Sequence, residues 1–381
     1  MSQPSYMGLT WDHPRGYRAL DAAAALAGEQ GLSIRWDRQP LEGFESRPIA
    51  ELAALYDLLV LDHPHLGDAL DADCLVPLDE VLGAEVIGEI VKATIGPCAE
   101  SYRLDGKLWA LPLDAATQVM AYRPDLLEGE PPATWDAVAT LAERGGVALS
   151  LAGPHALLTL MSISAAIGAP ADDDALFEPA YGAEAYGILA SFYANAVYAA
   201  LPLNPVGLLD HMAINNDITL CPLVFGYVNY TAPQHGRPIA FANAPATAAG
   251  GRRPGSVLGG TGIGITKRCQ VTPDLVTHLA WLLGAEAQTR FIPNHKGQPS
   301  RRDAWADGAV NAAWPNFYAA TARTLESAYV RPRLQGFVPL QLEAAATIRA
   351  ALAERSSGPA LIDRLNRLYR RLKSSSEGFT P

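Results

Sequence analysis

The sequence is poor in cysteine and in basic residues. Its four cysteines, Cys74, Cys98, Cys221 and Cys269, lie far apart without C-x-x-C spacing, so neither a zinc site nor a redox pair is indicated. The 29 basic residues against 40 acidic ones give a net charge of −11, which argues against nucleic acid or an anionic membrane as the main partner. We therefore expect no nucleic-acid partner, no metal and no cofactor.

The amino terminus also lacks a long hydrophobic run. Residues Met1 to Tyr6 include no basic residue, and the apolar run Met7–Trp11 is too short for a signal peptide or a membrane span. We expect a chain made without a signal peptide, which favours the cytoplasm. Removal of a signal peptide from the sequence as given is the other explanation.

Motifs of common enzymes are missing too. The sequence contains no G-x-S-x-G, no H-E-x-x-H and no nucleophile with an identifiable base, so we predict no catalytic residues. The glycines Gly260, Gly262 and Gly264 do not form a phosphate loop, because Ile265 stands where G-x-G-x-x-G requires its last glycine. These absences favour a binding protein over an enzyme.

What is present predicts an α/β protein of two domains. The 381 residues are 49% hydrophobic and 18% charged, and this length exceeds what one core normally supports. In the first part of the chain strands alternate with helices, which predicts a parallel sheet. The expected strands are Met7–Asp12, Ser33–Asp37 and Tyr56–Asp62, and the expected helices are Arg15–Gln30 and Ile49–Leu55.

The stretch 102–126 predicts a hairpin followed by a domain crossing. Asp105-Gly106 between two β-prone runs is a strong hairpin signal, so we expect a hairpin at 102–111. Pro112 cannot donate to a sheet ladder, so the chain should leave one sheet near Pro112–Asp114 and then enter another. A later strand at Val257–Thr266 is the expected returning crossing, and Thr272–Ile292 is expected as one long helix capped by Thr272.

Candidate ligand-binding residues follow the predicted strands, because open α/β sheets bind ligands at the carboxyl ends of their strands. One alternative is that Trp11 closes the core while Asp12 caps a helix. A metal at the histidines after the third strand is disfavoured, because no second distant cluster is present. The candidates at these two strand ends are Trp11, Asp12, His13, Asp62, His63 and His65.

Further candidates lie at the crossings and in the second domain. Asp114 follows the first crossing, and Gly260 and Thr261 offer backbone that can approach a ligand. In the segment 225–230, Phe225, Tyr227 and Tyr230 could stack on the C–H face of a sugar. The alternative for this segment is a hydrophobic hairpin packed in the core.

Several blocks, in order, resemble the family 1 extracellular solute-binding proteins of carbohydrate ABC importers, the maltose-binding-protein-like group. The blocks cover roughly residues 5–350, and their order is more specific than any one of them. They are Leu75-Val76-Pro77-Leu78-Asp79, Asp105-Gly106-Lys107-Leu108-Trp109-Ala110-Leu111-Pro112, Tyr122–Leu126, Pro132-Ala133-Thr134-Trp135-Asp136, Leu258-Gly259-Gly260-Thr261-Gly262, and Gln288 with Gly297-Gln298-Pro299.

The resemblance implies a two-lobed, periplasmic-binding-protein-like (type II) α/β fold with an interlobe cleft and hinge crossings. The predicted N-terminal lobe comprises 1–112 and 259–313, and the predicted C-terminal lobe comprises 113–258 and 314–381. The resemblance places Gln298 and Arg301 near the cleft, where Arg301 could fork a hydroxyl pair or a carboxylate.

The implied function is non-enzymatic binding of a small polar ligand, above all a sugar, by hinge closure. The protein would be the monomeric substrate-binding component of an ABC transporter, with the transporter's membrane subunits as partners and a periplasmic location. The alternative is a cytoplasmic sensor or carrier of an organic or aromatic acid, suggested by the missing signal together with His13, His63, His65 and Arg301.

Overall fold

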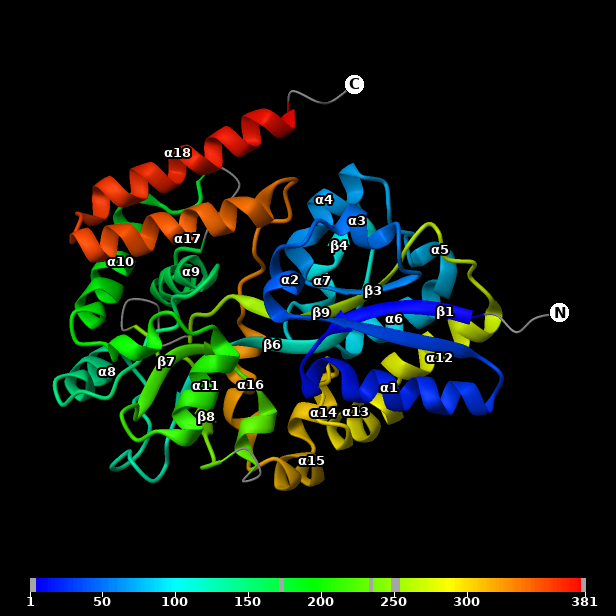
Figure 1. Cartoon of the computed structure of the whole chain (residues 1–381), viewed down its shortest axis with the longest axis horizontal. Coiled ribbons are helices and arrows are strands. Elements are labelled where there is room, and N and C mark those ends of the chain that lie inside the picture. Colours follow the sequence, from blue (N-terminus) through cyan, green and yellow to red (C-terminus); the bar gives the residue numbers. More distant parts are fainter. Residues whose placement is uncertain (1–4, 171–174, 233–235, 248–253, 378–381) are drawn as a thin grey trace. The chain divides into compact units, whose positions relative to one another are not determined.

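The computed structural model describes residues 5–170, 175–232, 236–247 and 254–377, and it divides into two compact units. Unit 1 comprises Met1–Ala115, Gly259–Ala313 and Pro332–Val338, and unit 2 comprises Ala116–Leu258, Trp314–Arg331 and Pro339–Pro381. The fold is α/β, and the chain passes repeatedly from one unit to the other. Figure 1 labels the elements along the chain.

Unit 1 is built on a mixed sheet in the order β2-β1-β3-β9. β1 pairs in parallel with β2 and β3, as the alternation of strands and helices predicted, whereas β9 runs antiparallel to β3. The parallel pairing expected for the first part of the chain is confirmed for β1, β2 and β3, and the later part of the chain returns through the antiparallel β9. The strands are β1 (Ser5–Trp11), β2 (Ser33–Gln39), β3 (Leu58–Leu61) and β9 (Leu258–Ile265), the last of which begins in unit 2.

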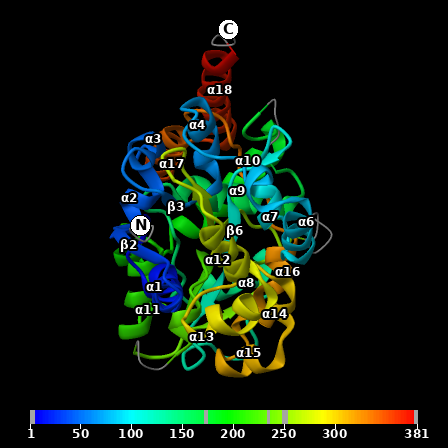
Figure 2. The same cartoon turned by 90° about the vertical axis from the view of Figure 1, so that its right-hand side faces the viewer.

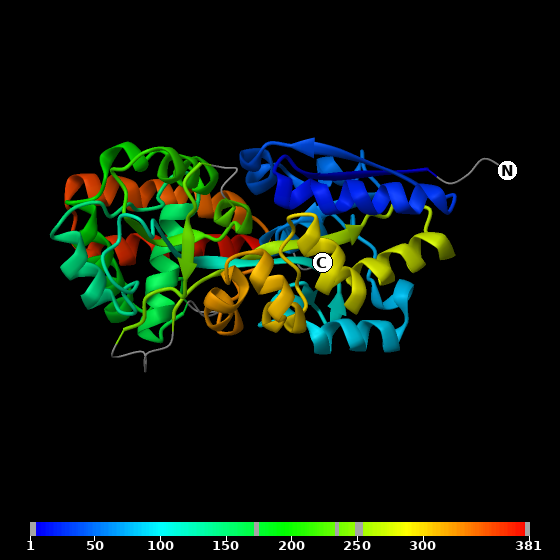
Figure 3. The same ribbon diagram turned by 90° about the horizontal axis from the view of Figure 1, so that it is seen from below.

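The helix α1 (Pro14–Glu29) runs along the strands β1 and β2 and packs against them, as Figure 3 shows. Pro14 opens the helix and the alanine-rich run 22–25 gives it high propensity. Its buried side chains form one stripe along the helix. They include Ala19, Leu20, Ala23 and Ala27.

The hairpin predicted at 102–111 is confirmed. β4 (Arg103–Leu104) pairs with β5 (Lys107–Leu108), and Asp105 and Gly106 both have positive φ, 52° and 77°. Positive φ at both central residues is what a type I′ turn requires. The next strand, β6 (Leu111–Tyr122), continues through Pro112 rather than ending there. Pro112 is its second residue, and the pairing of β6 with β7 and β8 covers Gln118–Tyr122, beyond the proline.

The helix expected at Thr272–Ile292 is interrupted. Thr272 caps α12 (Pro273–Leu283) as predicted, with its hydroxyl oxygen 3.4 Å from the amide of Leu275. Gly284 then adopts an extended conformation and ends the helix, so the expectation of one continuous helix is wrong. The chain resumes as the π-helical η5 (Ala287–Phe291) and α13 (Ile292–Asn294), followed by α14 (Arg302–Ala306) and α15 (Gly308–Ala313), which Figure 2 shows grouped together.

Unit 1 also contains several short helices. They are α2 (Leu41–Ser46), α3 (Ile49–Ala53), η1 (His63–His65), α4 (Leu66–Asp71), α5 (Asp79–Leu82), α6 (Ala84–Ala93) and α7 (Cys98–Ser101).

Unit 2 contains a smaller antiparallel sheet surrounded by helices. β6 pairs antiparallel with β7 (Leu220–Phe225) and with β8 (Ala240–Ala242). Two long helices, α17 (Phe337–Glu354) and α18 (Gly358–Glu377), follow each other in Figure 1, and α17 starts in unit 1. The helix α10 (Pro179–Tyr193) packs on both α9 (His155–Ile167) and α18. The other helices are α8 (Trp135–Ala142), η2 (Tyr198–Ala200), α11 (Pro205–Ile214), η3 (Val228–Thr231) and α16 (Phe317–Glu326).

Candidate functional site

The carboxyl ends of the parallel strands β1, β2 and β3 lie together at one end of the sheet of unit 1, which we call the strand-end edge. Trp11 is opposite Gln39 at the ends of β1 and β2, and β3 is in register with both through β1. Because β9 is antiparallel and pairs Gly262 with Leu61, the start of β9 reaches the same edge. The structure therefore brings eight predicted residues to this edge: Trp11, Asp12, His13, Asp62, His63, His65, Gly260 and Thr261.

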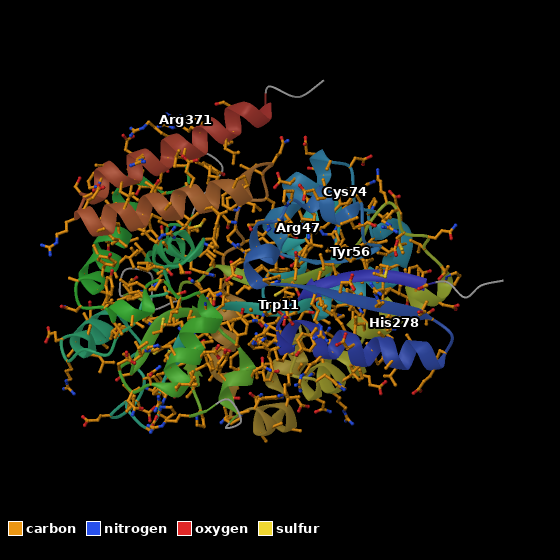
Figure 4. The ribbon with its side chains drawn as sticks, viewed as in Figure 1. Trp11, Arg47, Tyr56, Cys74, His278 and Arg371 are labelled. Carbon is orange, nitrogen blue, oxygen red and sulfur yellow. The ribbon has the colours of Figure 1, made fainter. Side chains whose placement is uncertain are left out.

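The indole of Trp11 is held between the first turn of α1 and a histidine. Trp11 ends β1 close to the start of α1 (Figure 4), and the His13 ring stacks on it with 5.3 Å between centroids and 10° between planes. His13 also caps α1, because its Nδ1 accepts the amide N–H of Arg15 at 3.2 Å. Gly16 makes room for the indole, since a Cβ there would lie 2.4 Å from Nε1 of Trp11.

One alternative is correct in part, because Trp11 is buried in the core, but Asp12 does not cap α1. Its side chain is exposed and lies 3.9 Å from the guanidinium of Arg38. Arg38 in turn bonds Asp21 and lies over the ring of Tyr17, 3.5 Å from its centroid. Asp12 thus belongs to a surface group of charges beside the strand ends.

Arg15 and Asp114 form a buried ion pair at the start of β6. Arg15 Nε donates to Asp114 Oδ2 at 2.9 Å, and Arg15 Nη2 donates to Oδ1, so the guanidinium and the carboxylate meet as two forks. The guanidinium carbon is also 5.5 Å from the Trp11 ring centroid. The carboxylate that the sequence placed just past a crossing is thereby tied to the strand-end edge of its own unit.

The polar residues that follow β3, Asp62, His63 and His65, make hydrogen bonds and ring contacts within unit 1. Asp62 Oδ1 accepts the amide N–H of His63 at 2.9 Å and also lies 3.1 Å from the His63 ring atom Nδ1. His63 is the first residue of η1. His65 Nε2 is 3.2 Å from the carbonyl oxygen of Phe44. The His63 ring meets the edge of Tyr102, 6.3 Å between centroids. These contacts give all three residues a structural role, and their contact with a ligand stays a prediction.

The polar loop after α13 forms hydrogen bonds with Ala115, the residue of β6 at which the chain leaves unit 1. Gln298 exchanges two hydrogen bonds with the backbone of Ala115, of 2.9 and 3.0 Å. Arg301 instead faces acidic neighbours, with its Nε 2.9 Å from Asp303 and its Nη1 3.3 Å from Glu89. Gln298 therefore holds the backbone of Ala115 in place, and the Arg301 guanidinium is already paired with carboxylates.

In unit 2, aromatic rings gather at the end of β7. Phe225 ends the strand and meets the His155 ring at 5.8 Å, and Tyr227 meets Tyr230 edge-on at 6.4 Å. The hydroxyl of Tyr230 donates to Asp210 on α11 at 2.7 Å, and burial together with this carboxylate raises the pKa of Tyr230. The segment 225–230 is therefore not the hairpin of the alternative, because Phe225 ends β7 and Val228–Thr231 form the 3-10 helix η3. The rings of Tyr227 and Tyr230 are buried, as that alternative expected.

Sequence reasoning missed Arg15, Gln39 and His155. The strand expected at Ser33–Asp37 stopped two residues before Gln39, where β2 ends. The position of the His155 ring depends on how α9 packs on β7, which no pattern within a few residues specifies. Arg15 carries no local signal for a partner that is 99 positions away.

Across the described ranges, no group of three or more histidine, cysteine, aspartate or glutamate side chains is arranged to hold a metal ion. Within the same ranges, no helix is long and apolar enough to cross a membrane.

The fold is that of the two-lobed solute-binding proteins. An ABC transporter solute-binding protein from Agrobacterium radiobacter K84, in complex with ribitol, matches with a TM-score of 0.81 at 18% identity over 97% of this chain and 98% of that one. The counterpart from Agrobacterium vitis S4 with bound D-mannitol gives 0.77 at 17% identity over 99% and 100%. Maltose-bound MalE3 of T. maritima gives 0.75 at 16% identity over 97% and 99%.

Sequence comparison gives the family. Residues 29–289, more than half of the chain, match the model of the bacterial extracellular solute-binding proteins, and the chain belongs to that family. It is therefore a solute-binding protein and not an enzyme, as the sequence blocks and the absent catalytic motifs predicted.

Proposed function

We propose that this protein binds a sugar or polyol and presents it to the membrane subunits of an ABC transporter. The observation that carries the proposal is the strand-end edge of unit 1, where the Trp11 indole, the His13 imidazole and the Arg15–Asp114 fork lie next to one another. Aromatic faces stack on the C–H face of a sugar, and planar charged groups bond its hydroxyls.

The aromatic cluster of unit 2 supports the same ligand class. Its rings at the end of β7, Phe225, Tyr227 and Tyr230, are of the type that stacks on sugars. The matched structures of the same fold carry ribitol, D-mannitol and maltose, ligands that share vicinal hydroxyls. A neutral polyhydroxylated ligand is the class that both arguments favour.

Isothermal titration with ribitol, D-mannitol and maltose tests the proposal. We expect heat with at least one of them, and affinity about five- to tenfold weaker in Trp11→Ala and in Tyr227→Ala, because stacked rings contribute roughly 1–1.5 kcal/mol each. Tyr193→Ala is the control, since this tyrosine ends α10 and does not belong to the cluster. Absence of both heat and thermal shift with every sugar and polyol would exclude the ligand class.

An organic or aromatic acid remains the alternative ligand. Its proposed anchor is Arg301, which already pairs with Asp303 and Glu89, and this pairing favours the neutral ligand. Titration with benzoate and citrate tests the alternative, and binding that survives Arg301→Ala would remove its basis.

The proposal also includes the oligomeric state of the protein, its closure on the ligand and its location in the cell. The family description supports a location outside the cytoplasmic membrane, and a monomer that closes by hinge motion is the form that the sequence resemblance implies. Cell fractionation distinguishes the periplasm from the cytoplasm. Small-angle scattering with and without ligand measures both mass and compaction, and an unchanged radius of gyration on saturation would contradict closure.

A further inference from the structure

Unit 1 contains a cavity at the far end of α1. A cavity of about 480 Å³ lies between the carboxyl-terminal end of α1 and the helix α12. Because α1 begins at the strand-end edge and lines the cavity from Leu26 to Glu29, the cavity is about 18–22 Å from that edge along the helix axis. Its volume falls in the range of small-molecule sites, and it does not belong to the candidate sugar site.

One wall of the cavity is an aromatic surface of fixed orientation. Trp281 on α12 is held edge-on by Phe291, with 5.1 Å between centroids, and it lies beside His278 at 5.9 Å. Leu26 of α1 faces the same cavity and keeps 40% of its surface exposed. An apolar or aromatic group of a ligand would therefore have both an indole and an aliphatic side chain to cover it.

The charges around the cavity have one sign. The acidic side chains Glu29, Asp274 and Glu286 line it, and among the residues that the structure describes no lysine or arginine does. His278 adds no positive charge at neutral pH, because burial lowers its pKa below the usual value. The cavity is thus acidic with an aromatic wall.

The end of α1 adds to this polarity. A helix carries partial negative charge at its carboxyl terminus, and α1 has no basic residue in its last turn. It has Glu29 there instead, where a negative side chain is unfavourable in the absence of a cation. Asp274 is explained by its place in the first turn of α12, but Glu29 is not explained by helix stability.

We propose that this cavity binds a small organic cation, an ammonium group carried on an apolar or aromatic body. The ammonium would lie near Glu29, Glu286 and the last carbonyls of α1, and the body would cover Trp281 and Leu26. Neutral sugars lack the charge, and anions would be repelled. The ligand class therefore differs from that of the strand-end edge.

Titration of the full chain with benzylammonium tests the proposal, with benzyl alcohol and benzoate as the neutral and anionic analogues. We expect benzylammonium to bind at least about tenfold more tightly than benzyl alcohol at low salt, and benzoate not to bind. The double substitution Glu29→Gln/Glu286→Gln should remove this preference, and both side chains are exposed, so folding is not at risk.

The matched control is Glu143→Gln, which removes the same charge from the exposed end of α8 in unit 2 and should leave binding unchanged. Trp281→Phe should weaken benzylammonium while keeping the preference for the cation. Equal affinity for benzylammonium and benzyl alcohol, no binding of the cation, or an unaltered preference in the double variant would each overturn the proposal. Sugar titration of the same variants should match the wild type, which keeps this test separate from that of the proposed function.

Discussion

The guanidinium of Arg15 and the carboxylate of Asp114 meet as a two-point fork inside unit 1, and their side chains are only 3% and 8% exposed. One comes from the first turn of α1 and the other from the start of β6. A charge buried in this way is stable only while its partner is present. The pair therefore fixes the position of Asp114 relative to Arg15, whose guanidinium lies over the Trp11 ring.

Removing one member of this pair should be strongly destabilising. Asp114→Ala leaves the buried guanidinium of Arg15 without its carboxylate, and we expect a loss of about 3–5 kcal/mol in the free energy of unfolding. Replacing both residues in Arg15→Met/Asp114→Leu should cost much less, because no unpaired charge remains. Urea unfolding of the three proteins measures this, and equal losses in the single and double variants would show that the ion pair is not the cause.

Gly16 should be needed for the position of the Trp11 indole. In Gly16→Ala the new Cβ would lie 2.4–2.5 Å from the indole, so the ring has to move. We expect a net loss of about 1–3 kcal/mol from overpacking, together with weaker sugar binding. Gly28→Ala on the same helix is the matched control, since its Cβ meets nothing within 4 Å and should stabilise α1 by up to about 1 kcal/mol. Similar effects at both positions would contradict the role of Gly16.

A buried hydroxyl network in unit 2 should be sensitive to a single oxygen. Ser256 Oγ donates to the carbonyl oxygen of Gln118 at 2.6 Å and lies 2.6 Å from Thr117 Oγ1. Ser256→Ala leaves buried groups without this partner, so we expect a loss of about 1–3 kcal/mol. Ser191→Ala, at an exposed serine of α10, should change stability by less than about 0.5 kcal/mol in the same denaturation experiment. A wild-type midpoint for Ser256→Ala would show that the network does not stabilise unit 2.

The pH dependence of stability should include one acidic step from Asp125. Hydrogen bonds from the buried Arg123, 2.8 Å to each carboxylate oxygen, lower the pKa of Asp125 to about 2 from 3.8. A pKa that is lower in the folded state adds stability above the unfolded value, and that stability is lost as the pH falls from about 4 toward 2. The difference in unfolding free energy between the wild type and Asp125→Asn should therefore be larger at pH 5 than at pH 3. A difference that does not change between these two pH values would exclude this linkage.

Local features of the fold were predictable because their causes lie within a few residues. The hairpin at Asp105-Gly106 follows from the positive φ values that its turn needs. Thr272 caps α12 because its hydroxyl reaches an amide three positions ahead. The order of the family-like blocks likewise predicted the two-lobed fold that the comparisons show.

Features that depend on distant parts of the chain were decided only by the tertiary structure. The antiparallel entry of β9 places Gly260 and Thr261 at the strand-end edge, and nothing within that strand's own residues specifies its direction. The interruption at Gly284 and the pairing of Arg15 with Asp114 depend in the same way on what packs against them. Hydrophobic periodicity and capping specify elements, whereas side-chain partners far apart in sequence are specified by the order and register of the strands that carry them. The sequence by itself therefore determined the class of fold and the kind of residue at each strand end, and the tertiary structure decided which of these residues touch.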